Sequence, residues 1–116
     1  MSIALKNVVL FVTDLERAKR FYAEQLGLPL QQESPALLEF FGGETRLGVA
    51  LALHEDARKL VGRHTGITLR VDDLDTLCAR LSASGVRFPE PLERSPWGKM
   101  AVVADPDGNQ IALVDV

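Results

Sequence analysis

Cysteines, clusters of basic residues and long apolar runs are all scarce in this sequence, and each scarcity excludes a class of protein. Cys78 is the single cysteine, so no intrachain disulfide can form, and a reducing compartment suits the chain. The net charge is −3 and the basic residues are dispersed, which offers no footprint for nucleic acid or an anionic membrane. No run approaches the roughly 20 apolar residues of a membrane-spanning helix. The first residues also lack the pattern of a secretory signal, and we expect a cytoplasmic protein.

The composition is that of an ordinary globular protein. The chain has 116 residues, of which 47% are hydrophobic and 25% are charged. A chain of this length can bury a core without disulfides or a structural metal. We therefore expect one domain over residues 1–116.

An internal repeat organises the chain. Residues 10–15 and 69–74 both read Leu-x-Val-x-Asp-Leu, and the two copies are 59 residues apart. Each copy follows a segment rich in β-branched residues, at 3–12 and 66–71, and each runs directly into a helical pattern. The repeat predicts two strand–helix units of one design.

The two predicted helices have matching signals. Thr13 with Glu16 forms a capping-box pattern for the first helix, and Asp72 is the predicted cap of the second. Gly27 and Gly85 are expected to end them. Apolar residues at helical spacing predict the buried stripes, which are Leu15, Ala18, Phe21, Tyr22 and Leu26 in the first helix and Leu74, Leu77, Cys78 and Leu81 in the second.

Strand patterns follow each helix. They lie at 28–33, 36–41 and 46–53 in the first half, and at 86–88, 99–104 and 110–116 in the second. Gly42-Gly43 and residues 105–109 carry turn signals. The sequence thus predicts an α+β protein of two βαβββ modules, with module one at 1–53, module two at 66–116, and a linker at 54–65 that contains a short helix at 55–61.

These segments resemble the vicinal oxygen chelate superfamily, which includes glyoxalase I, extradiol dioxygenases, methylmalonyl-CoA epimerase and bleomycin-resistance-type proteins. The resemblance spans nearly the whole chain, and its carriers are residues 8–15, 20–22, 26–28, 66–74, 96–98 and 105–109. It implies a curved eight-stranded mixed sheet of two half-barrels, with helices on the convex face and a ligand on the concave face.

The resemblance also locates the family's metal positions. Enzymatic members hold a divalent metal through four side chains, usually His and Glu. In this sequence those positions fall on Asn7, about Ala50, Gly66 and Ala112. Alanine and glycine offer no side-chain ligand to a cation. We therefore expect no metal and no cofactor, and the sequence favours a binding protein over an enzyme.

Strand periodicity predicts a cavity independently. The bulky residues at 8, 10, 12, 67, 69 and 71 share one face of their strands, which suits packing against helices. The opposite face carries mostly small or polar residues: Asn7, Val9, Phe11, Gly48, Ala50, Ala52, Gly66, Thr68, Arg70, Ala112 and Val114. Such a face leaves volume that a core would fill, as a ligand site does.

Trp97 is the leading candidate for ligand contact. It is the only tryptophan and lies in a Ser-Pro-Trp-Gly turn, and antibiotic-binding members of the family stack an aromatic side chain on planar ligands. The alternative is that it closes one end of the barrel or lies at a dimer contact.

The other candidates are weaker. Phe11, Phe40, Phe41 and Met100 can add apolar wall, with core packing as the alternative for the phenylalanines. Arg46 and Arg70 can bind a carboxylate or phosphate, although exposed strand-end arginines are common. Asn7 and Thr68 can orient a ligand or form a self-satisfied polar pair. His54 and His64 lie in the linker, away from the metal positions, and we expect them to be solvated.

Together these observations predict a metal-free protein that binds or sequesters a small, partly planar, apolar organic molecule, as antibiotic-resistance proteins do. The alternative is a glyoxalase-like lyase or isomerase, or a dioxygenase-related enzyme, with an atypical metal site or metal-independent acid–base chemistry. We also expect a homodimer, with or without module exchange, because short sheets leave edges that need cover.

Overall fold

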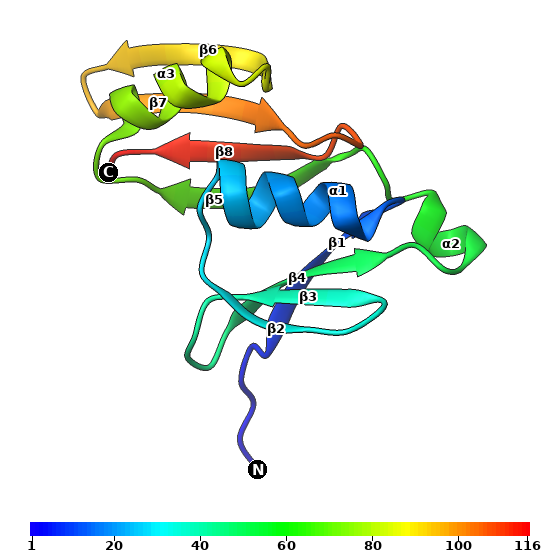
Figure 1. The fold of residues 1–116 in the computed structure, drawn as a ribbon. Coiled ribbons are helices and arrows are strands. Elements are labelled where there is room, and N and C mark those ends of the chain that lie inside the picture. Colours follow the sequence, from blue (N-terminus) through cyan, green and yellow to red (C-terminus); the bar gives the residue numbers. More distant parts are fainter. The chain divides into compact units, whose positions relative to one another are not determined.

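The structure is a computed structural model of residues 1–116, and it divides into two compact units, Met1–Val61 and Gly62–Val116. Each unit contains one four-stranded mixed sheet, and the strand orders are equivalent: β1-β4-β3-β2 and β5-β8-β7-β6. In each sheet the first strand pairs in parallel with the last, and the other pairs are antiparallel. The predicted α+β class and the two βαβββ modules are confirmed (Figure 1).

The first unit begins with β1 (Asn7–Val12), α1 (Leu15–Lys19) and a π-helical segment, η1 (Arg20–Gln25). Strands β2 (Leu30–Glu33), β3 (Leu37–Phe40) and β4 (Arg46–Leu51) follow, and then the short helix α2 (Glu55–Arg58). The eight expected strands therefore form two sheets of four, and neither sheet closes into a barrel.

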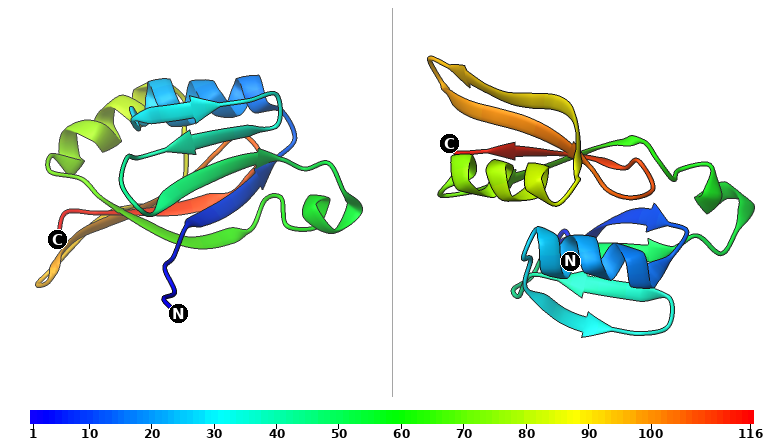
Figure 2. Two further views of the ribbon diagram at one scale, coloured as in Figure 1. Left: turned by 90° about the horizontal axis from the view of Figure 1, so that it is seen from below. Right: turned by 45° about the horizontal axis from the view of Figure 1, so that its top comes forward.

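The second unit begins with β5 (His64–Arg70) and α3 (Leu74–Ala83). Its remaining strands are β6 (Arg87–Ser95), β7 (Gly98–Ala104) and β8 (Gln110–Val114). Figure 2 shows β6 and β7 as a long hairpin, coloured yellow to orange.

Both helix caps lie one residue later than predicted. The Asp14 carboxylate accepts the Arg17 backbone N–H at 3.1 Å, and the Asp73 carboxylate accepts the Thr76 backbone N–H at 3.2 Å. Asp73 also accepts the Thr76 hydroxyl at 2.7 Å. An N-cap needs its side-chain oxygen to reach the N–H three residues on, and here the aspartates, not Thr13 or Asp72, meet that requirement.

The predicted first helix changes its winding partway. It continues from α1 into η1, where the Leu26 N–H donates to the Phe21 carbonyl at 2.8 Å, five residues back. The adjacent aromatic residues Phe21 and Tyr22 are both buried, and their rings meet edge to face with centroids 4.8 Å apart. Tyr22 also lies 6.0 Å from the Phe40 ring of β3. This aromatic cluster is the centre of the first unit's core.

The predicted helix stripes are confirmed as core except at Leu15, which is only half-buried. Leu10 and Val12 are fully buried under α1 and η1, whereas Val8 is exposed. In the second unit Leu74 and Leu81 are buried against the sheet that contains Ile111, Leu113 and Val103, all of them fully buried. Each unit therefore has its own core between one helix and one face of its sheet.

Strand β6 is much longer than the predicted strand at 86–88. It continues through Pro89 and Pro91 to Ser95, in residues that lie outside the predicted strands. Proline is tolerated because β6 is an edge strand, bonded only to β7, and its pairing shifts register between Arg87 and Glu90 and again before Glu93. No helix of the structure combines the length and the apolar character needed to cross a membrane.

Candidate ligand-binding faces

One face of each sheet is covered by a helix, and the other is the helix-free face. In the first unit the Tyr22–Phe40 contact places the Phe40 side of β3 under the helix. In the second unit the Lys99 ammonium is paired with the Asp75 carboxylate of α3, which places the Lys99 side of β7 under that helix. Because side chains alternate along a strand, the register then assigns every other strand residue to a face.

The helix-free face of the first unit is read from the strand pairs. Val9 lies opposite Gly48, which lies opposite Glu39, and Glu39 lies opposite Gln32. The next row contains Phe11, Ala50 and Leu37, and Asn7 pairs with Arg46 at the other end. The predicted candidates Asn7, Phe11 and Arg46 thus share this face.

An open groove of about 470 Å³ lies at the Asn7 end of this face. It is lined by Lys6, Asn7, Gln32, Leu37, Glu39, Gly43, Glu44 and Arg46. A smaller hollow of about 210 Å³ continues from it along β2 and β3 and shares Gln32, Leu37 and Glu39. The volume of the groove lies within the range of small-molecule sites, roughly 300–1,000 Å³.

Arg46 is the central charged residue of the groove. Its Nη1 lies 3.8 Å from Glu39 Oε1 and donates to Gln32 Oε1 at 3.4 Å. The Arg46 side chain is 34% exposed and the Glu39 side chain 17%. Both contacts are long for a guanidinium, whose strong hydrogen bonds are about 2.7–2.9 Å. These partners therefore hold the Arg46 guanidinium in position but do not use its full hydrogen-bonding capacity.

The sequence suggests that the small residues of this face leave empty volume. In the structure this is not so at Gly48. A Cβ on Gly48 would lie 3.1 Å from Val9 Cγ2 and 3.4 Å from Leu37 Cδ1. The neighbouring side chains therefore lean over the glycine and fill its place. The open space lies instead at the polar end of the face, around Arg46.

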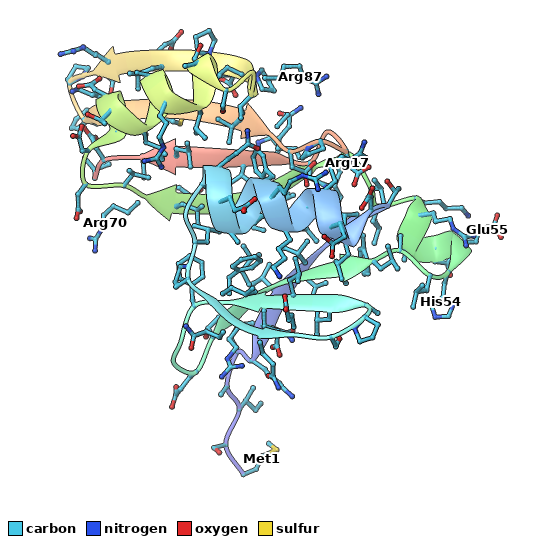
Figure 3. All side chains as sticks on the ribbon, in the orientation of Figure 1. Met1, Arg17, His54, Glu55, Arg70 and Arg87 are labelled. Carbon is cyan, nitrogen blue, oxygen red and sulfur yellow. The ribbon has the colours of Figure 1, made fainter.

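The helix-free face of the second unit brings together three other candidates. Arg70 pairs with Val114, which pairs with Met100, and Thr68 pairs with Ala112, which pairs with Val102. Met100 is 42% exposed. The Arg70 side chain extends away from β5 (Figure 3). The face has an apolar centre, with Arg70 at the β5 edge and Glu90 and Glu93 of β6 at the other.

Trp97 lies at the tip of the β6–β7 hairpin and is 84% exposed. Its turn is held by several bonds. The Trp97 N–H donates to Ser95 Oγ at 3.2 Å, and that hydroxyl donates to the Gly98 carbonyl at 2.8 Å. The Lys99 N–H donates to Asp115 Oδ1 at 2.8 Å, which ties the turn to the C-terminal residues. The indole is thus carried on a fixed turn.

Two phenylalanine candidates do not line the groove. Phe40 is fully buried in the aromatic core, and its alternation with Glu39 assigns it to the helix side. Phe41 follows the end of β3 in a left-handed conformation, with φ of 71°, and its N–H donates to the Pro29 carbonyl. The strand predicted at 36–41 therefore ends one residue early, and neither ring lines the groove.

The linker histidines are also placed. His54 precedes α2 and points outward with Glu55 (Figure 3). His64 begins β5, and its Nδ1 accepts the Gly66 N–H at 3.2 Å. Both are exposed. Neither histidine lines the groove.

The residues at the family's metal positions do not fit a divalent cation. Asn7 offers a single amide, and Ala50, Gly66 and Ala112 have no side-chain donor. Zinc, iron and nickel sites need several imidazole, thiolate or carboxylate ligands. The structure gathers no three His, Cys, Asp or Glu side chains that could hold a metal ion.

Sequence reasoning missed most of the groove. Four of its lining residues are not among the predicted candidates: Lys6, Gln32, Glu39 and Glu44. A signal was available, because Glu39 alternates with Leu38 and Phe40 and is followed, after a glycine turn, by Arg46 on the next strand. Opposite charges on the polar phase of a hairpin favour contact across the two strands.

Comparisons with known proteins agree with this architecture. The family model described as the Glyoxalase/Bleomycin resistance protein/Dioxygenase superfamily matches residues 4–113. The crystal structure of TnmS3, an antibiotic-binding protein from Streptomyces sp. CB03234, is 34% identical, with a TM-score of 0.81 over 98% of this chain and 97% of that chain. A superfamily member from Sphaerobacter thermophilus DSM 20745 is 33% identical, with a TM-score of 0.78 and 97% of each chain covered. The uncharacterized protein YraH of Bacillus subtilis (strain 168) is 29% identical over 94% of this chain and 95% of its own length.

Proposed function

The chain belongs to the glyoxalase/bleomycin resistance protein/dioxygenase superfamily, and we propose that it binds and sequesters a small, partly planar organic molecule. The mechanism is stoichiometric: no bond is made or broken, and the ligand is withheld from its target for as long as it stays bound. The similarity to an antibiotic-binding protein supports this class of ligand.

The observation that carries the proposal is the Trp97 turn. A large indole that is 84% exposed leaves much apolar area in water, unless a ligand or partner covers it. The bonds around Ser95 and Gly98 hold the turn before any ligand arrives. Preorganisation of this kind lowers the entropic cost of binding. Trp97 therefore supplies the stacking surface for the planar part of the ligand.

The helix-free face of each unit offers further groups that can contact a ligand. Met100 and Phe11 add apolar surface to their respective faces, and Thr68 and Asn7 offer hydrogen bonds. Arg46 and Arg70 are the cationic groups that can fix a ligand's acidic group, since a guanidinium binds a carboxylate in a fork.

Fluorescence titration tests the proposal, because Trp97 is the sole tryptophan. We expect saturable quenching at one ligand per chain when bleomycin, mitomycin C or another aromatic antibiotic is titrated into the protein. Equilibrium dialysis checks the stoichiometry. The absence of saturable binding across a broad panel of planar antibiotics would contradict the proposal.

Elemental analysis separates this proposal from an enzymatic one. We expect the purified protein to contain no stoichiometric Zn, Ni, Mn or Fe, because the residues at the metal positions are poor ligands. A bound metal that supports turnover of a glyoxalase-type or dioxygenase-type substrate would overturn sequestration as the function.

We further propose that the protein is a homodimer. Each four-stranded sheet is open, with β1 and β2 at the edges of one and β5 and β6 at the edges of the other. Open edges and exposed apolar residues such as Ile3 and Leu5 favour pairing with a second chain. Light scattering coupled to size-exclusion chromatography measures the mass directly, and a monomer at all concentrations would contradict this proposal.

A further inference from the structure

From the groove around Arg46 we infer a recognition site for a small zwitterionic group, one that bears both a carboxylate and a protonated amine. The inference rests on the proposed function for the claim that this helix-free face binds a ligand, and it names the polar chemistry of that ligand. All eight lining residues lie within the first unit.

The first support is the charge of the groove. Lys6 and Arg46 are cationic, Glu39 and Glu44 are anionic, and Asn7 and Gln32 are neutral amides. The formal charges cancel. A groove with equal numbers of cations and carboxylates complements a ligand group of zero net charge that is strongly dipolar, whereas a simple anion or cation would meet as much repulsion as attraction.

The second support is the order of these groups across the sheet. Lys6 and Asn7 lie at the start of β1, and Arg46 begins the neighbouring strand β4. Glu39 lies on β3, next in order, and Gln32 lies on β2 at the far edge. Apart from Glu44 in the β3–β4 loop, the donor side chains lie on the β1 and β4 side of the groove, and the acceptor side chains lie on the β3 and β2 side. Neighbouring strands are about 4.8 Å apart. The carboxylate and the amine that an α-amino acid bears on one carbon can therefore face β4 and β3 at once.

The third support is the fixed backbone at the rim. The Arg46 N–H donates to the Lys6 carbonyl at 3.1 Å, and the Thr45 hydroxyl donates to the Leu5 carbonyl at 2.8 Å. These bonds hold the two cationic residues on adjacent backbones. The long Arg46–Glu39 contact of 3.8 Å leaves the guanidinium able to turn toward a carboxylate without losing a strong protein bond.

The second unit provides an internal comparison. It repeats the same strand order, and its register places Gln110 and Val102 where the first unit has Arg46 and Glu39. The second unit therefore forms the same fold without an ion pair at this position. A half-buried ion pair adds little stability over neutral residues. The pair in the first unit is thus explained better by binding than by folding.

Matched probes with one phenyl ring test the inference. L-Phenylalanine has both charges, phenethylamine has only the amine, 3-phenylpropanoic acid has only the carboxylate, and 3-phenylpropan-1-ol has neither. We expect phenylalanine to bind most tightly, by about tenfold over the alcohol, when binding is followed by NMR in isotope-labelled protein. The perturbed signals are expected at the Asn7 and Gln32 side-chain amides and at the Arg46 guanidinium.

Two substitutions separate the two charges. Arg46→Gln should abolish the preference for phenylalanine over phenethylamine, and Glu39→Gln should abolish the preference over phenylpropanoic acid. Arg58→Gln, an exposed arginine of α2 that does not line the groove, is the matched control and should change neither preference. If the NMR spectrum shows that Arg46→Gln does not fold, Arg46→Lys is used instead. This variant keeps the positive charge and should keep the preference for phenylalanine over phenethylamine, at lower affinity.

Several outcomes would overturn the inference. They are equal affinity for phenylalanine and the alcohol, no binding of any probe, perturbed signals only outside the groove, or an equal effect of Arg58→Gln. These results are distinguishable from failure of the proposed function, which is judged by antibiotic quenching of Trp97. Saturable quenching without the probe ranking would overturn the zwitterion site alone.

Discussion

Asp14 and Asp73 are equivalent residues of the two units, 59 positions apart, and each accepts the backbone N–H of the residue three positions on. The sequence repeat Leu-x-Val-x-Asp-Leu contains this aspartate as its fifth residue. The repeated spacing within the chain thus reflects a shared structural requirement: a strand must end and a helix must begin with only two or three residues between them. An aspartate that caps the helix meets that requirement in both units.

The Asp73 cap predicts a pH-dependent stability. Hydrogen bonds from Thr76 hold the pKa of the Asp73 carboxyl below its ordinary value of 3.8. A carboxyl whose pKa is lower in the folded state stabilises the fold above its unfolded pKa, and this contribution is lost as the pH falls through the folded value. We expect Asp73→Ala to melt at a lower temperature than the parent at pH 7, with a smaller difference below pH 3.8. Asp72→Ala, one residue earlier and exposed, is the control and should match the parent throughout.

Phe40 is predicted to matter for stability and not for ligand binding. Its ring is fully buried against Tyr22, and Phe→Ala substitutions in cores typically cost about 3–5 kcal/mol. Denaturant titration of Phe40→Leu, the milder change, should show a clear loss of unfolding free energy with antibiotic affinity intact. Phe11→Leu on the helix-free face should instead weaken antibiotic binding and change the free energy of unfolding little. A fall in affinity for the folded Phe40 variant would return this residue to the binding site.

Trp97 is predicted to contribute to binding and not to stability. Because its side chain is exposed, Trp97→Leu should change the free energy of unfolding by no more than about 0.5 kcal/mol. Loss of stacking should weaken binding of a planar antibiotic by about 1 kcal/mol, or roughly fivefold. Calorimetry measures this without the fluorescent residue. Trp97→Tyr retains a flat ring, and its affinity should fall between those of the parent and Trp97→Leu. Equal affinity of the parent and both variants would assign the indole another role.

Gly98 is predicted to be the least replaceable residue of the hairpin turn. Its φ of 133° lies where other residues are strained, and an added Cβ would lie 2.5 Å from Val116 Cγ1 and 2.7 Å from Asp115 Oδ1. Gly98→Ala should destabilise the protein by about 2 kcal/mol or more, measured by denaturant titration. Removing Val116 should recover part of this loss in the variant while changing the parent little. If the effects of Gly98→Ala and of removing Val116 on the free energy of unfolding simply add, the contact with Val116 is not the cause of the lost stability.

Cys78 is predicted to be unreactive while the protein is folded. It is 6% exposed on the buried stripe of α3, and burial raises the pKa of its thiol, which keeps the nucleophilic thiolate scarce. Labelling with a thiol reagent at pH 8 should be slow in buffer and rapid in denaturant. Rapid stoichiometric labelling in buffer would mean that α3 opens readily from its sheet.

The repeat, the helix stripes and the order of helices and strands along the chain could be predicted because each depends on local sequence patterns. Leu74, Leu77, Cys78 and Leu81 are spaced for one helix face whatever lies beside them, and burial follows from that spacing alone. The helix caps were misplaced by one residue, since Thr13, Asp14, Asp72 and Asp73 are all suitable capping residues. Only backbone geometry selects among them.

The site was less predictable because it depends on register between strands. Whether Gly48 opens a cavity depends on Val9 and Leu37, two neighbours on other strands that lean over it. The Arg46–Glu39 contact likewise requires knowing which residue of β3 lies beside which residue of β4. The length of β6 was missed for a different reason: prolines usually end a strand, and only its place at the sheet edge permits Pro89 and Pro91.

Those two prolines have a consequence under the proposed function, that of a protein acting by stoichiometric capture. Such a protein has to accumulate to at least the concentration of the molecule it withholds, and crowded chains with free strand edges tend to polymerise through them. Pro89 and Pro91 remove two amide hydrogens from β6, and its register shifts make it an irregular template for a further strand. We therefore expect the irregular β6 edge to hinder aggregation at the concentrations that such capture requires.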